Sequence, residues 1–268
     1  MFSSKAIAIR DAEIQDFVNN IGLDTNSIIS PAFFVKEHRQ WLLNTDFYVE
    51  CLDRFKYGYI TAGCTEAFNE VYREPCYVLE GEYTYHRDSH RAIETTLHNI
   101  PFGSRLIISY PFAATGNPHE DWDYILDYCK TKNIRIFVDA CLAGVSIGKL
   151  NLRNPIITHV AFSFSKAFNT GHFRCGVVYT NQNTSTASTL NKHLYLNHPS
   201  INLHMKLMTE FPSNYIAKKY GTKQLDICNE NDLLPSDCIL FGLDNGLRQC
   251  LSPVLGTQSL FPAHHSQQ

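Results

Sequence analysis

The chain has 268 residues, 44% of them hydrophobic and 18% charged, which is enough to bury one large domain with at most a small appendage. Its net charge of −3 comes from interspersed acidic and basic residues, and this argues against a nucleic-acid-binding surface. No apolar run approaches the roughly 20 residues of a membrane helix, and the N-terminus lacks a signal-peptide core. We therefore expect a soluble, cytoplasmic protein with no nucleic-acid or membrane partner.

The nine cysteines agree with an intracellular location. Their number is odd and no two form a CxxC pair, so reduced thiols are expected rather than a disulfide framework or a zinc site. The twelve histidines also lack metal-ligand spacing. No metal site is expected.

The first half of the chain alternates between strand and helix patterns. The sequence predicts, in chain order, a strand over 57–62, a helix over 64–73, a strand over 76–80, a helix over 89–100, a strand over 105–110 and a helix over 119–131. In the second helix Ile93, Leu97 and Ile100 would share one face. The third helix has acidic residues in its first turn and Lys130 in its last, as the helix dipole prefers.

The alternation continues and then weakens. Strands are predicted over 134–140, 158–164 and 174–180, followed after residue 181 by a polar, helix-poor turn, NQNTSTAST. A helix over 198–211, a strand over 238–243 and a disordered tail, HHSQQ, complete the prediction. The expected division is an N-terminal segment (1–50), a large domain (51–200) and a reduced C-terminal region (201–268).

This pattern predicts an α/β fold. Strands that alternate with helices form a mainly parallel sheet covered by helices on both faces. Such sheets bind ligands beyond the carboxyl ends of their strands. Gly63, Asp139 and Lys166 all follow or end predicted strands, so we expect them to converge at one edge of the sheet.

The residues at that edge carry complementary chemistry. Asp139 ends an apolar strand, so its partly desolvated carboxylate favours a cationic partner. Lys166 has apolar neighbours, which favour a neutral, nucleophilic amine. Arg174 offers a fork suited to a phosphate, and Gly63-Cys64-Thr65 lies between a strand and a helix, where free N–H groups bind anions.

Each feature alone also has an ordinary structural explanation. An aspartate at a strand end is often a turn former, and an arginine beside a strand is usually part of a surface ion pair. Cys64 and Thr65 could simply begin a helix. Taken together, however, an anion site, a nucleophilic amine and an acid for a ring cation are what pyridoxal 5′-phosphate (PLP) requires.

The motifs resemble those of fold type I PLP-dependent enzymes, and especially the aspartate aminotransferase superfamily (aminotransferase class I/II-like). Ser163-Phe164-Ser165-Lys166 matches the family's S-x-S-K, and Arg174 with Gly176 matches its R-x-G. "VDACLAG" (138–144), "TAGCTEAF" (61–68) and "EGEYTYHR" (80–87) resemble the segments around the family's cofactor site. The resemblance covers about residues 55–180 and implies a large domain with a seven-stranded-type, mainly parallel (mixed) sheet.

The resemblance also implies residue roles. Lys166 would form the internal aldimine with PLP and act as the catalytic base. Asp139 would bind the ring nitrogen, and Tyr83 would stack on the ring, with Tyr85 as the alternative. The phosphate would be held by the remaining cofactor-binding residues: Gly63, Cys64, Thr65, Ser163 and Arg174. The family further implies a homodimer.

Several positions depart from the family pattern. Ala113 stands where the family has an asparagine that contacts the cofactor's 3-oxygen, and Asn117 could replace it only after a rearrangement of the loop. Leu142 replaces a tyrosine. The C-terminal region is short, and alignment of "CILFGL" places Cys238 on the family's substrate-binding arginine. Arg248 is the candidate replacement.

The expected function is that of a PLP-dependent aminotransferase acting on an amino acid or related amine. Two alternatives remain open. One is another fold type I reaction, such as that of a decarboxylase, lyase or racemase, because the same anchoring residues serve all of them. The other is a non-catalytic PLP-fold binding protein that has lost its substrate domain.

Overall fold

A computed structural model describes residues 6–43, 47–72, 74–88 and 91–256. The tail at 264–268, for which disorder was expected, lies outside the described residues. None of the helices in these ranges is long and apolar enough to cross a membrane.

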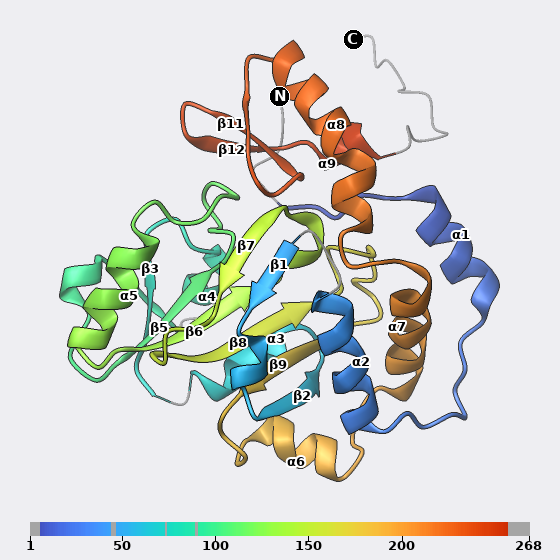
Figure 1. The fold of residues 1–268 in the computed structure, drawn as a ribbon, viewed down its shortest axis with the longest axis horizontal. Helices are drawn as coiled ribbons and strands as arrows, with labels where there is room; N and C mark the ends of the chain where they lie inside the picture. Colours follow the sequence, from blue (N-terminus) through green and yellow to red (C-terminus); the bar gives the residue numbers. More distant parts are fainter. Residues whose placement is uncertain (1–5, 44–46, 73, 89–90, 257–268) are drawn as a thin grey trace.

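A seven-stranded sheet with strand order β2-β9-β8-β6-β5-β3-β4 forms the centre of the molecule (Figure 1). Its strands are β2 (Tyr57–Thr61), β3 (Cys76–Leu79), β4 (Ile93–Thr95), β5 (Arg105–Ser109), β6 (Arg135–Ala140), β8 (Ile157–Ser163) and β9 (Gly176–Thr180). From β4 to β8 all neighbours are parallel, whereas β9 is antiparallel to both β8 and β2. The prediction of a mainly parallel sheet is confirmed.

The central strands are buried because both of their faces are covered. From Ile136 to Ala140 every residue of β6 is buried, as is usual for a parallel strand packed on both sides. On one face Ile136 and Val138 belong to the main core, together with Phe34 of α2 and Ile125 of α5. On the other face Phe137 belongs to a smaller cluster under α3.

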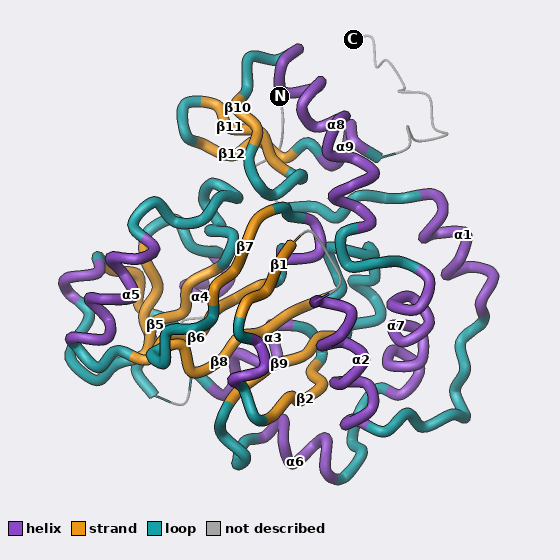
Figure 2. Tube along the Cα trace, in the orientation of Figure 1, coloured by secondary structure: helices purple, strands orange, loops and turns teal. Residues whose placement is uncertain are grey.

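Helices surround the sheet (Figures 1 and 2). The described helices are α1 (Ala12–Ile21), α2 (Pro31–Leu43), α3 (Cys64–Ala67), α4 (Thr84–Asp88), α5 (Trp122–Thr131), α6 (Thr186–Lys192), α7 (His198–Glu210), α8 (Tyr215–Glu230) and α9 (Ser252–Leu255). Short 3₁₀ turns are η1 (Leu52–Arg54), η2 (Phe68–Glu70), η3 (Leu97–Asn99) and η4 (Ala143–Val145).

The described residues also form two small sheets. Strand β1 (Phe47–Glu50) pairs in parallel with β7 (Gly148–Asn151). Strands β10 (Leu234–Pro235), β11 (Phe241–Asp244) and β12 (Leu247–Cys250) form an antiparallel sheet. This sheet gathers with α8 and α9 at the top of Figure 1, and we call these elements the C-terminal unit. The boundary expected after residue 200 falls inside α7, whose Leu207 belongs to the main core.

The helix predicted over 89–100 is wrong. Ile93–Thr95 forms edge strand β4, paired with Tyr77–Leu79 of β3, and Leu97–Asn99 makes only a 3₁₀ turn. Ile93 is 56% exposed, so Ile93, Leu97 and Ile100 share no buried face. The β-branched residues of this short run favour a strand, and apolar spacing alone does not separate the two structures over so few residues.

The polar turn predicted after residue 181 is also wrong in part, because α6 begins at Thr186. Ser185 Oγ accepts a hydrogen bond from Ser188 N, and Ser188 Oγ accepts one from Ser185 N. This reciprocal cap satisfies two N–H groups that the helix start would leave open. The strand expected over 238–243 begins later, at Phe241, because Cys238 pairs with Ser146 in an isolated bridge.

Candidate active site

The strand register brings the predicted site residues to one edge of the sheet. Gly176, which starts β9, pairs with Thr61 at the end of β2 and with Ser163 at the end of β8. Asp139 lies one residue before the end of the neighbouring parallel strand, β6. The turn that carries Lys166 and the residues just before Gly176 therefore leave the sheet at this same edge.

Gly63, Thr65, Ser163 and Arg174 form a polar cradle. Arg174 Nε donates to Ala62 O at 3.0 Å, and its Nη2 donates to Thr65 Oγ1 at 2.8 Å. Gly63 has φ +73°, and a Cβ there would lie 3.1 Å from Arg174 Nη2 and 3.3 Å from Ser163 Oγ. A side chain at position 63 would be strained and would also fill the cradle. A guanidinium, two hydroxyls and an open glycine suit an anion such as a phosphate.

Asp139 lies beside this cradle and is only 3% exposed. Its Oδ1 accepts a hydrogen bond from Cys141 N at 3.0 Å. Burial raises the pKa of Asp139 to about 6, although hydrogen bonds from Cys64, the Cys141 backbone and the Cys141 thiol oppose the rise. Among the described residues no basic side chain bonds this carboxyl. A buried acid with only neutral donors favours a cationic ligand atom such as a protonated ring nitrogen.

Tyr83 lies on the other side of Cys141. The Cys141 Sγ and Tyr83 Oη atoms are 3.5 Å apart, and burial raises the pKa of Tyr83. Tyr85, the alternative stacking residue, is 41% exposed. The structure therefore brings Tyr83, and not Tyr85, next to Asp139 through a shared neighbour.

Lys166 is half-buried. Its Nζ donates to Ala6 O at 2.5 Å. Burial raises the pKa of Cys141, Asp139 raises it further, and the positive charge of Lys166 partly offsets this rise. The buried acid and Tyr83 thus both contact Cys141, and the charge of Lys166 acts on the same thiol.

Arg248 reaches the site from β12 in the C-terminal unit. Its Nη1 donates to Ala113 O. Its guanidinium carbon lies 5.2 Å from the Phe241 ring centroid and 5.9 Å from that of Tyr83. Cys238, by contrast, is fully buried. Of the two positions considered for a C-terminal arginine, only Arg248 presents a cation beside Tyr83.

The three positions that depart from the expected motif place no free polar side chain at the site. Ala113 is fully buried and its N–H donates to Ser109 Oγ at 2.8 Å. Asn117 Oδ1 accepts from Asp237 N at 2.7 Å, so this side chain is engaged with the C-terminal unit. Leu142 is 1% exposed and belongs to the main core.

Glu82, Cys141 and Ser165 were missed by reasoning from the sequence. Glu82 is 8% exposed and hydrogen-bonds to Ser109, and Ser165 Oγ lies 3.1 Å from Ser163 Oγ. An acid in a turn after a strand normally faces solvent. Only its position next to Tyr83 could have suggested a role for Glu82.

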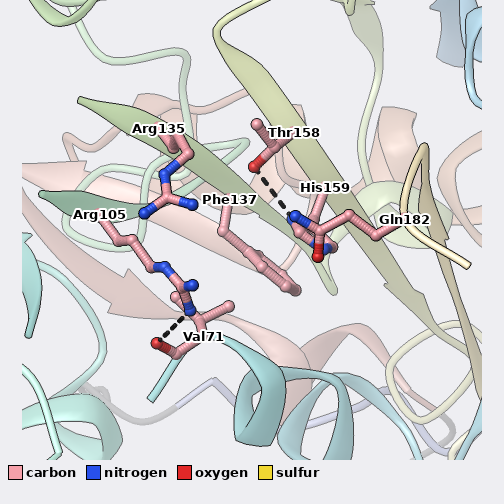
Figure 3. A pocket seen from close by; sticks show the side chains of 7 residues that line it. All are labelled: Val71, Arg105, Arg135, Phe137, Thr158, His159 and Gln182. Carbon is pink, nitrogen blue, oxygen red and sulfur yellow. Dashed lines mark hydrogen bonds between the residues drawn. The ribbon is translucent and has the colours of Figure 1, made fainter. Parts of the chain in front are cut away.

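A small cavity lies at the opposite edge of the sheet (Figure 3). Arg105 and Arg135, the first residues of β5 and β6, line it together with His159, and both arginines pair with Glu74. Its volume of about 10 Å³ holds about one water molecule. It is therefore too small for a substrate and is separate from the site described above.

Comparison with known proteins shows the family of the chain. The family model described as "Aminotransferase class I and II" matches residues 53–208, a range that includes every predicted site residue except Arg248. Comparison with curated protein sequences yields no match.

Three solved structures are similar in fold. Substrate-bound BacF from Bacillus subtilis is 12% identical with a TM-score of 0.64, covering 89% of this chain and 72% of its own. A probable N-succinyldiaminopimelate aminotransferase from Thermus thermophilus is 16% identical with a TM-score of 0.60, covering 89% and 77%. A PLP-bound C–S lyase from Staphylococcus hominis is 14% identical with a TM-score of 0.58, covering 82% and 63%.

Proposed function

Because the chain belongs to the aminotransferase class I and II family, we propose that it is a PLP-dependent aminotransferase acting on an amino acid or related amine. The observation that carries the proposal is the convergence of Lys166, Asp139 and the Arg174 cradle at one edge of the sheet. These three groups match the aldehyde, the ring nitrogen and the phosphate of the cofactor.

The residues present fit this cofactor. The open space at Gly63 and the donors of Thr65, Ser163 and Arg174 suit its phosphate. Asp139, buried among neutral donors, suits a protonated ring nitrogen. We assign the ring face to Tyr83, the aldehyde to Lys166, and an amide contact with the phosphate to Cys64, the first residue of α3.

Each residue then has a defined task. When bound, PLP supplies a carbonyl that condenses with amines and a protonated ring that accepts electrons from the substrate's α-carbon. Asp139 would favour the protonated form of the ring nitrogen, because a buried negative charge stabilises a neighbouring cation. Lys166 Nζ takes the proton from the α-carbon and returns it at a neighbouring atom, work that is typically worth ~10²–10⁴-fold in rate.

Arg248 is our candidate for binding the substrate's carboxylate. Its guanidinium is held over Tyr83 and Phe241 and already bonds an oxygen, that of Ala113. A carboxylate would offer the fork two acceptors and an opposite charge, which makes a stronger bond than a neutral carbonyl. An amino-acid-like substrate is the ligand that this pairing supports.

Other PLP chemistry is the second candidate. Ala113 and Leu142 leave two positions near the assigned ring without polar side chains, and this would alter the electronic control of the reaction. The structural relatives include a C–S lyase as well as an aminotransferase. The same anchors would also serve a decarboxylase or racemase, and a binding protein without catalysis would need only the cofactor contacts.

We further propose a cytoplasmic homodimer. The nine cysteines are free thiols, which fits a reducing compartment, and the family resemblance supports the dimer. Sedimentation velocity of the purified protein should give a dimer mass, and a monomer across the concentration range would contradict this part.

The proposal is tested by an absorbance titration of the purified protein with PLP, followed by a panel of amino acids. We expect a visible absorbance band that Lys166→Ala abolishes and the exposed control Lys132→Ala retains. One amino acid should bleach the band, with formation of its keto acid and of pyridoxamine phosphate.

The possible outcomes separate the candidates. Release of carbon dioxide, ammonia with a thiol, or a racemised amino acid would indicate the other PLP reactions. A visible band that no amino acid changes would indicate a binding protein. A Lys166→Ala protein with an unchanged band would overturn the proposed site.

A further inference from the structure

Glu82 is a buried acid with an unusual set of bonds. It lies in the turn after β3 and is 8% exposed. Its Oε1 accepts from Ser109 N at 2.7 Å, and its Oε2 accepts from Ser109 Oγ at 2.8 Å and from Tyr83 N at 3.3 Å. Each of these donors is neutral, so none of the three hydrogen bonds supplies an opposite charge to the buried carboxyl, which is costly.

Ser109 connects Glu82 to Asp139. Ser109 ends β5 and pairs in register with Asp139 of the parallel strand β6. Paired residues of neighbouring strands point to the same face of a sheet, so the Ser109 hydroxyl stands next to Asp139. Burial raises the pKa of Glu82 to about 7. The hydrogen bonds from Ser109 oppose this rise, and the charge of Asp139 adds to it.

Ser109 also connects Glu82 to the turn that receives Arg248. Ser109 Oγ accepts a hydrogen bond from Ala113 N at 2.8 Å, and Ala113 O accepts one from Arg248. The Glu82 carboxyl therefore bonds two groups directly: the backbone of Tyr83, and Ser109, which is the neighbour of Asp139. Through Ser109 it also holds the turn at Ala113. All three are parts of the proposed cofactor and substrate site.

We infer that Glu82 is a positioning residue of this site: it holds the backbone of Tyr83 directly and, through Ser109, the Ala113 turn around Asp139. The inference rests on the proposed function. Glu82 contacts neither substrate nor cofactor in this assignment and acts through Ser109 and Tyr83.

Glu82→Gln is a sharp test because the amide keeps the shape of the side chain but has only one acceptor oxygen. The amide nitrogen of the glutamine would face an N–H or O–H donor from which the carboxylate accepted a hydrogen bond. The exposed Glu80, two residues earlier in the same turn, provides the matched control Glu80→Gln. Ser109→Ala is the second variant, since it removes the hydroxyl link and leaves Glu82 in place.

The measurements are the PLP dissociation constant of each apoprotein and the visible circular dichroism of the bound cofactor. We expect Glu82→Gln to weaken PLP binding about tenfold and to change the dichroism, with a similar but smaller effect for Ser109→Ala. Glu80→Gln should match the wild type. In the apoproteins, amide hydrogen exchange at Ala113 should accelerate in Ser109→Ala.

The PLP affinities and dichroism of the variants decide whether Glu82 has this positioning role. If folded Glu82→Gln binds PLP like the wild type with unchanged dichroism, the inference is wrong while the proposed function stands. If Glu82→Gln does not fold, the same two measurements on Ser109→Ala decide. A wild-type protein without the visible band would overturn the proposed function itself, and this inference with it.

Discussion

At the scale of single residues, burial gives Asp139 a measurable effect on stability. The pKa of this carboxyl is raised to about 6 from its ordinary value of 3.8, so the folded protein binds more protons than the unfolded chain between these values. Stability of the apoprotein should then fall as pH rises through this window. A shift of this size corresponds to about 3 kcal/mol at neutral pH.

Asp139→Asn should remove this penalty. We expect the apoprotein variant to equal the wild type in unfolding free energy near pH 4 and to exceed it by up to about 3 kcal/mol at pH 8, as measured by urea unfolding. The exposed control Asp226→Asn should leave the wild-type pH dependence intact. Parallel pH curves for the wild type and Asp139→Asn would show that the acid is not desolvated.

At the scale of elements, Asp11 joins the start of α1 to α8. It caps α1 by accepting from Ile14 N at 3.0 Å, accepts from Tyr220 Oη at 2.7 Å and pairs with Lys219 at 2.8 Å. Burial raises the pKa of Asp11, but the bonds from Lys219, Ile14 and Tyr220 outweigh it and leave the pKa lowered. This stabilisation exists above the unfolded pKa and is lost as pH falls through the folded value.

Asp11→Ala should therefore lower the unfolding free energy by about 3 kcal/mol at pH 7, because a helix cap and a buried pair are lost together. The difference should shrink in acid. Thermal or urea unfolding measures it, and Asp16→Ala on the exposed side of the same helix is the control. Equal losses for the two variants would contradict this role of Asp11.

At the scale of the whole molecule, Arg248 is one of the contacts between the C-terminal unit and the rest of the chain, and it lies at the site. It bonds Ala113 O and lies over the rings of Tyr83 and Phe241. If it binds the substrate's carboxylate, Arg248→Ala should raise KM about tenfold or more while changing kcat less. The surface variant Arg153→Ala should change neither.

A merely structural role for Arg248 predicts another outcome. Its loss would then destabilise the packing of the C-terminal unit, and urea unfolding would change while KM stayed within a factor of about two. Steady-state kinetics and unfolding of the same variant therefore separate the two roles.

Structural features could be predicted from the sequence where they depend on residues close together in the chain. Strand positions 134–140 and 174–180 were predictable from their apolar runs, and the motif Ser163–Lys166 fell at a strand end. The helix predicted over 89–100 was wrong because a short apolar spacing fits two structures. The start of α6 was missed because Ser188 stands where a capping box that begins with serine usually has a glutamate or glutamine.

By itself, the sequence determined that Asp139 and Lys166 lie at one edge of the sheet, because alternating strands and helices place the ends of parallel strands on one side. Arg174 lies at the same edge because β9 runs antiparallel to β8. Only the tertiary structure decided the burial of Glu82 against Ser109, 27 residues away, and the reach of Arg248 to Ala113 across 135 residues. Such contacts depend on which surfaces pack together, and no local pattern of residue types encodes that choice.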